Sequence, residues 1–123
     1  VLRSVYIPQN DGNQNVHSGF IKVGVRKSME IALVSLAYHI LTTNENIITH
    51  AGIAIGSVAP TVMFTSSACE ILVGRNLAKI DRETAAEFAK IVIEYASPIS
   101  DIRASAWYRK KVLHNICVSI FEK

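Results

Sequence analysis

The fold is decided by residues 31–58, which read IALVSLAYHIL (31–41), TTNEN (42–46) and IITHAGIAIGSV (47–58). The first run is apolar at nearly every position. This is typical of a strand covered on both faces, although a helix also fits its periodicity. The middle run is a cluster of turn residues, and the third run alternates between two faces. We therefore predict a long β-hairpin over residues 31–58.

One face of the second predicted strand has very little side-chain bulk. It carries His50, Gly52, Ala54 and Gly56. Another group can approach the backbone closely along a face of this kind.

Two more strands are expected before the hairpin. Residues 2–7 are β-prone and end at Pro8, and residues 17–25 alternate between two faces. Residues 9–15, QNDGNQN, are all amide or turn types, so we expect an exposed loop between the two strands.

After Pro60 the pattern becomes helical. Residues 67–70, SACE, have the spacing of a capping box, and Gly74 is expected to end the helix that follows. Asp81 can cap a second helix, whose apolar stripe covers residues 85–96 and which ends before Pro98.

A last helix is expected over residues 108–121. Its periodicity places Leu113 and Cys117 on the apolar side. Its water-facing residues are expected to be Arg109, Lys110, His114 and Ser119.

This order of elements predicts an α+β fold. We expect a small antiparallel β-sheet of three to four strands, followed by about three helices packed on one face. The 123 residues are enough for a single domain, residues 1–123. Because the chain does not begin with Met, we expect it to be a fragment or processed piece of a longer protein.

The composition excludes several classes of protein. With 50% hydrophobic and 19% charged residues, the chain is not intrinsically disordered. The net charge of +3 comes from scattered cations, so no nucleic-acid partner is expected. Residues 47–64 lack charge but contain His, Gly and Pro, so we expect no membrane span. The two cysteines are expected to be buried, reduced thiols, and the four histidines show no metal-ligand spacing.

One segment has the residues for chemistry on a flat ring. Residues 20–30, FIKVGVRKSME, place three cations and an aromatic residue around a strand end. Lys22, Gly24 and Arg26 share one face of a strand, and a lysine held over an electron-accepting ring can stabilise negative charge on its carbonyl oxygens. A solvated strand end is the alternative. The chain contains no nucleophile motif, phosphate loop or dinucleotide fingerprint, and we predict no catalytic residue.

Four stretches in sequence order resemble one known domain. They are RSVYIP (3–8), FxKxGxR (20–26) followed by IALVS (31–35), AIGSVAPT (54–61) and SPISDIRASAxYR (97–109). Together they resemble the C-terminal domain of the FAD-binding (medium) subunit of molybdenum hydroxylases. This family includes carbon monoxide dehydrogenase and xanthine dehydrogenase.

The resemblance implies a fold, a cofactor and partners. The family fold is a small antiparallel sheet with three helices. The resemblance implies that the chain is a C-terminal fragment of a longer FAD-binding subunit, in which FAD is held mainly by an N-terminal domain. The flavin receives electrons from 2Fe–2S iron–sulfur clusters in a small subunit, which take them from molybdopterin in a large subunit. The flavin then passes them to an acceptor. The expected protein is thus part of a cytoplasmic molybdenum–flavin oxidoreductase, and the fragment alone is expected to be inactive.

The resemblance also implies cofactor-binding residues. Lys22 matches the lysine that reaches the isoalloxazine edge, and Arg26 to Glu30 match the loop that flanks the flavin. One departure is Met29, which stands where some members have an acidic residue. Asp101 and Arg103 also match family positions, and we interpret them as structural.

The alternative hypothesis is a non-enzymatic protein-interaction module. In that case the face of His50, Gly52, Ala54 and Gly56 would serve docking only.

Overall fold

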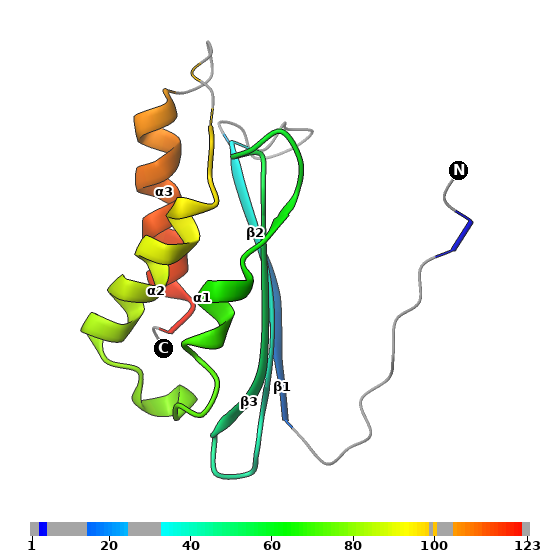
Figure 1. The fold of residues 1–123 in the computed structure, drawn as a ribbon, viewed down its shortest axis with the longest axis vertical. Helices are drawn as coiled ribbons and strands as arrows, with labels where there is room; N and C mark the ends of the chain where they lie inside the picture. Colours follow the sequence, from blue (N-terminus) through cyan, green and yellow to red (C-terminus); the bar gives the residue numbers. More distant parts are fainter. Residues whose placement is uncertain (1–2, 5–14, 25–32, 99, 101–104, 122–123) are drawn as a thin grey trace.

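The computed structural model describes residues 3–4, 15–24, 33–98, 100 and 105–121. Within these ranges an antiparallel sheet comes first and helices follow (Figure 1). The elements are β1 (Asn15–Val23), β2 (Val34–Thr42), β3 (Ile48–Gly56), β4 (Met63–Phe64), α1 (Ser66–Glu70), the 3₁₀ helix η1 (Leu77–Lys79), α2 (Arg82–Glu94) and α3 (Ala106–Ser119). The predicted α+β class is confirmed.

The predicted hairpin is the centre of the sheet. β2 and β3 pair antiparallel, and the strand order is β1-β2-β3-β4. β1 pairs with β2 from Asn15↔Thr42 to Val23↔Val34, which confirms the strand expected at residues 17–25 in its described part. Of the strand expected at residues 2–7, only Arg3 and Ser4 are described, and they belong to no strand. The expected loop at residues 9–15 lies outside the described residues except for Asn15, which begins β1.

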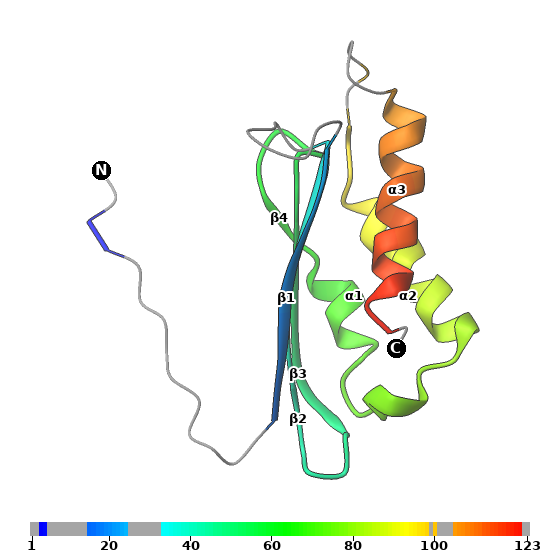
Figure 2. The same ribbon diagram turned by 180° about the vertical axis from the view of Figure 1, so that it is seen from behind.

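The described helices all lie on the same side of the sheet (Figures 1 and 2). The core between the two layers contains Leu36, Ile53 and Ile55 from the sheet and Phe88 and Leu113 from the helices, all almost fully buried. On the opposite face of β2, Ala37 and His39 are exposed. The prediction that this strand is covered on both faces is therefore wrong for the described part of the chain.

Two of the α-helices begin at side-chain caps. The carboxylate of Asp81 accepts the amide of Thr84 at 2.7 Å, which confirms the cap predicted for α2. The hydroxyl of Ser105 accepts the amide of Tyr108 at 3.1 Å at the start of α3.

The capping box predicted for α1 is wrong. The helix begins after Thr65, whose hydroxyl instead donates to the carbonyl of Ile53 at 2.9 Å. The hydroxyl of Ser67 lies 2.7 Å from the Tyr95 hydroxyl, so it is engaged with α2. Gly74 has φ +89°, as a left-handed stop requires, but α1 already ends at Glu70 and a turn leads to Gly74.

Both cysteines are buried, as the sequence predicts. Burial raises the pKa of the Cys69 thiol, and it raises the pKa of Cys117 to about 12.

None of the helices in the described part of the chain has the length and the apolar composition that a membrane span requires.

The cap of α2 predicts how stability depends on pH. Hydrogen bonds from Thr84 lower the pKa of Asp81 in the folded chain. A lowered folded pKa means that this stabilisation is present above the ordinary pKa and is lost as the pH falls through the folded pKa. In urea unfolding from pH 7 to pH 2.5, Asp81→Ala should be less stable than wild type at pH 7, and the gap should shrink below about pH 4. Asp81→Asn, which still caps, is the control. A gap that stays constant with pH would contradict this assignment.

Candidate functional site

Lys22, the one expected cofactor-binding residue that the structure describes, lies near one end of the sheet. There β1 ends, β2 begins and β3 ends; we call residues 22–24, 33–35 and 56–58 the loop end (top in Figure 1). Lys22 is exposed near the end of β1. Arg26 and Glu30 lie outside the described residues, so the structure places one of the three.

Lys22 belongs to the sheet face that the described helices leave uncovered, which we call the open face. Strand pairing puts Phe20 on the same face, two residues before Lys22, and their partners on β2 are Ala37 and Ser35. The Phe20 side chain is 66% exposed. The open face consists of Val16, Ser18, Phe20, Lys22, Ser35, Ala37, His39, Leu41, His50, Gly52, Ala54, Gly56 and Phe64.

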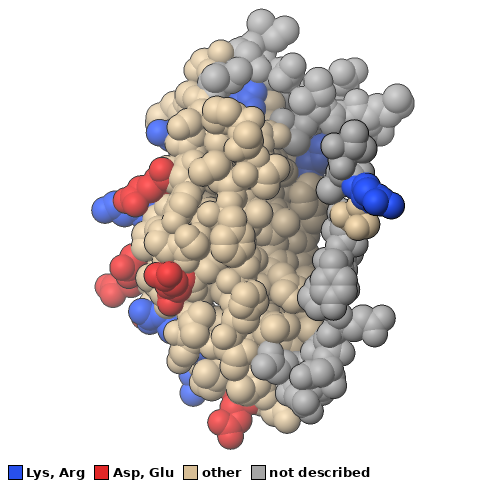
Figure 3. Space-filling view, turned by 45° about the vertical axis from the view of Figure 1, so that its right-hand side comes forward, with Lys and Arg blue, Asp and Glu red and all other residues tan. Residues whose placement is uncertain are grey.

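The composition of the open face suits an apolar, flat partner. Phe64 is 56% exposed and Val16 is 39% exposed. In Figure 3 the Asp and Glu side chains lie toward the left and lower borders of the view, some Lys or Arg side chains lie next to the grey atoms, and other residues form the centre. Lys22 is thus a cation beside a mainly uncharged sheet surface.

The small-residue row predicted on β3 lies on this open face. A Cβ on Gly52 would lie 3.5 Å from the ring of Phe64, so part of the bare backbone is already covered by β4. A Cβ on Gly56 would meet the Ser35 hydroxyl at 2.5 Å. The close approach expected here is therefore made, in the described residues, by side chains of the sheet itself.

Arg109 contradicts its sequence prediction. It was expected to face water, but its side chain is only 3% exposed. Its Nη1 donates to the carbonyl of Leu33 at 2.8 Å and to that of Ser57 at 3.2 Å. The periodicity contains the signal, since Arg109 lies four residues before Leu113 and shares its buried side of α3. The prediction that Arg109 faces water relies on its charge rather than on its position in the helix.

Further hydrogen bonds join the loop end to its surroundings. The amide of Leu33 donates to the carbonyl of Val23 at 2.7 Å. The amide of Ser97, which follows α2, donates to the carbonyl of Val58 at 2.6 Å. Ser57, which directly precedes Val58, has φ +65°, an uncommon conformation for a residue other than glycine. The loop end is therefore held by the Arg109 side chain from α3 and by the backbone of Ser97, which follows α2.

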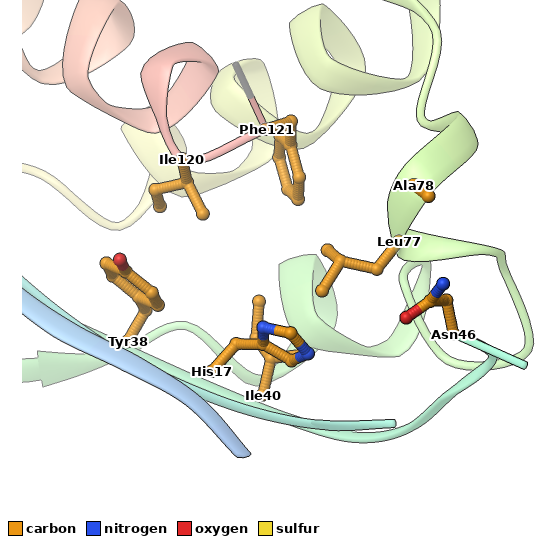
Figure 4. Close-up of a pocket in the computed structure, with 8 residues that line it drawn as sticks. All are labelled: His17, Tyr38, Ile40, Asn46, Leu77, Ala78, Ile120 and Phe121. Carbon is orange, nitrogen blue, oxygen red and sulfur yellow. The ribbon is translucent and has the colours of Figure 1, made fainter. Parts of the chain in front are cut away.

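A separate cavity of about 230 Å³ lies near the opposite end of the sheet, between η1 and the end of α3 (Figure 4). It is lined by His17, Tyr38, Ile40, Asn46, Leu77, Ala78, Ile120 and Phe121. His17 Nε2 lies 3.3 Å from the Thr42 hydroxyl. Lys22, the described one of the three predicted site residues, does not line this cavity. In the described ranges, no three His, Cys, Asp or Glu side chains are grouped to hold a metal ion.

Comparisons with known proteins agree with this architecture. Residues 20–123 match the sequence model of the CO dehydrogenase flavoprotein C-terminal domain. A comparison with curated protein sequences gave no significant match.

Solved structures with the same fold include two bacterial oxidoreductases. One is CO dehydrogenase from Hydrogenophaga pseudoflava, at TM-score 0.77 and 21% identity over 91% of this chain and 37% of that chain. Another is quinoline 2-oxidoreductase from Pseudomonas putida 86, at TM-score 0.73 and 28% identity over 86% of this chain and 35% of that one. The chain thus spans about a third of the length of these proteins. Because the family match covers most of its residues, the chain belongs to the CO dehydrogenase flavoprotein C-terminal domain family.

Proposed function

We propose that this chain is the C-terminal domain of the flavoprotein subunit of a molybdenum-containing oxidoreductase, and that its open face forms one wall of an FAD site. The observation that carries the proposal is the pair Phe20 and Lys22. An exposed aromatic ring and a cation lie on one sheet face, near the end of β1.

The two side chains suit a planar, electron-accepting ring. An exposed phenyl ring can stack on a flat heterocycle, which stabilises contact by about 0.5–1.5 kcal/mol beyond the buried area. An ammonium group at the ring edge stabilises negative charge on the carbonyl oxygens. FAD, when bound, accepts and passes on electrons. Lys22 would favour the reduced form, and Arg26 and Glu30 would flank the ring.

The remaining parts of the FAD site belong elsewhere in this proposal. The chain has no glycine-rich phosphate loop, so an N-terminal domain of the same subunit would hold the pyrophosphate. Electrons would arrive from 2Fe–2S clusters in a small subunit, fed by molybdopterin in a large subunit of a cytoplasmic complex. The family match and the similarity to CO dehydrogenase and quinoline 2-oxidoreductase support this assignment.

A protein-interaction module remains the second candidate. The observation in its favour is the open face, which exposes apolar side chains at both edges of the sheet. Val16 is exposed on β1, the strand of Phe20, and Phe64 is exposed on β4 at the other edge. Docking of a protein would use this whole surface, whereas a flavin ring would use the end near Lys22.

Titration with FAD tests the proposed division of roles. The 123-residue chain alone should bind FAD weakly or not at all, since it lacks a phosphate cradle, while the complete subunit should bind one FAD tightly. Quenching of flavin fluorescence measures both. Tight, stoichiometric binding by the chain alone would contradict the division, and no binding by the complete subunit would contradict the function.

Removal of the Lys22 cation should affect flavin chemistry more than folding. In the complete subunit we expect Lys22→Ala to slow flavin reduction by about tenfold, equivalent to ~1.4 kcal/mol. The free energy of unfolding should change by no more than about 0.5 kcal/mol, because the residue is exposed. Stopped-flow absorbance and urea unfolding measure the two effects. Lys90→Ala, an exposed cation on α2, is the matched control. Equal reduction kinetics in wild type and Lys22→Ala would remove Lys22 from the site.

Phe20 and Phe64 form a second matched pair. Both rings are exposed on the open face, but Phe20 lies on β1 near Lys22 and Phe64 on β4 at the other edge. Phe20→Ala should weaken FAD binding about two- to tenfold through lost stacking, and Phe64→Ala should leave it unchanged. Isothermal titration calorimetry of the complete subunit measures both. The stacking role would be wrong if the two variants bound FAD equally well.

A further inference from the structure

We propose that Arg109 is a positioning residue of the FAD site, which fixes the end of β1, the beginning of β2 and the end of β3 relative to one another. This inference rests on the proposed function. Arg109 is not expected to touch the flavin; it acts through the backbone next to Lys22.

The hydrogen bonds lead from α3 to the residue next to Lys22. The guanidinium Nη1 of Arg109 donates to the carbonyl of Leu33 at 2.8 Å. The amide of Leu33 donates to the carbonyl of Val23 at 2.7 Å. Val23 directly follows Lys22, and Leu33 directly follows residue 32. The end of β1 and the beginning of β2 are thus connected to one buried side chain.

The same guanidinium also reaches the end of β3. Nη1 lies 3.2 Å from the carbonyl of Ser57, which has φ +65°. Ser57 follows Gly56, and Gly56 pairs with Ser35 at the beginning of β2. Arg109 therefore fixes the end of β3 relative to the beginning of β2, at the loop end of the sheet.

The burial of the Arg109 cation lowers the stability of the fold unless other interactions compensate for it. Burial of a charge is unfavourable unless hydrogen bonds replace its hydration, and bonds from a charged donor are roughly twice as strong as neutral ones. An apolar side chain would pack this position more cheaply, as Leu113 does one turn further along α3. What an apolar side chain cannot do is hold two carbonyls from separate strands. Because binding and electron-transfer groups are sensitive to displacements of about 1 Å, such a clamp sets the position of Lys22.

The test compares two buried residues of one helix in the complete subunit. Arg109→Met removes the donors, Arg109→Lys keeps a charge with a shorter reach, and Leu113→Ala destabilises the core without touching the strand ends. The measurements are the Kd for FAD, the visible absorption spectrum of bound flavin, amide hydrogen exchange at residues 22–24 and 33–35, and the urea midpoint.

We expect Arg109→Met to raise the Kd for FAD at least tenfold, to shift the flavin spectrum and to speed amide exchange at Leu33. The Kd for FAD of Arg109→Lys should lie between those of Arg109→Met and wild type. Leu113→Ala should lower the urea midpoint but keep the Kd within twofold and the spectrum unchanged. If Arg109→Met does not fold, the test is the comparison of Arg109→Lys with Leu113→Ala. The inference then requires that Arg109→Lys changes the Kd for FAD and the flavin spectrum and that Leu113→Ala does not.

Two results would overturn the inference. One is FAD binding and a flavin spectrum like wild type in the Arg109 variants. The other is equal weakening of FAD binding in Leu113→Ala, which would make the effect one of stability alone. If wild type takes up no FAD, the proposed function fails and the role of Arg109 in an FAD site fails with it; amide exchange would still show separately whether Arg109 fixes the loop ends.

Discussion

Burial of one face of the β2–β3 hairpin determines where the other side chains go. Leu36, Ile53 and Ile55 point toward the helices and are at most 1% exposed. Each such side chain contributes about 1.5–3 kcal/mol when it leaves water. Because successive residues of a strand point to opposite faces, this burial fixes the register, and the register sends Phe20 and Lys22 to the open face. The candidate site is thus a consequence of the core.

The loop end needs a second constraint, because the pairing of β1 with β2 ends at Val23↔Val34. Arg109 supplies charge-assisted hydrogen bonds to the carbonyls of Leu33 and Ser57, and the amide of Ser97 adds a bond to Val58. The helical layer thus supports the sheet core and also the backbone of the loop end. α3 therefore reaches the loop end from the side of the sheet opposite to the open face.

The features that local sequence determines could be predicted. Alternation and turn residues indicate the hairpin, and the Asp81 cap follows from the preference of helix starts for a short acceptor side chain. The errors concern choices that distant partners decide. Ser67 bonds to Tyr95 rather than forming a capping box, and Arg109 is buried because two carbonyls more than 50 residues away in sequence replace water. The two-residue strand β4 was missed because Met63 and Phe64 are too short a run to show alternation. Of the three expected site residues, Lys22 lies among the described residues, near the end of β1, and Arg26 and Glu30 lie outside them; the FAD-binding role of all three stays a prediction.

The central claim is that the loop end of this sheet forms a wall of a flavin site. A crystal structure of the complete subunit with FAD tests it most directly. The account predicts that the Lys22 ammonium lies within hydrogen-bonding distance, about 3 Å, of a polar atom at the isoalloxazine edge, with the Phe20 ring beside the flavin plane. A Lys22 side chain directed into solvent, with the isoalloxazine bound away from the open face, would contradict it.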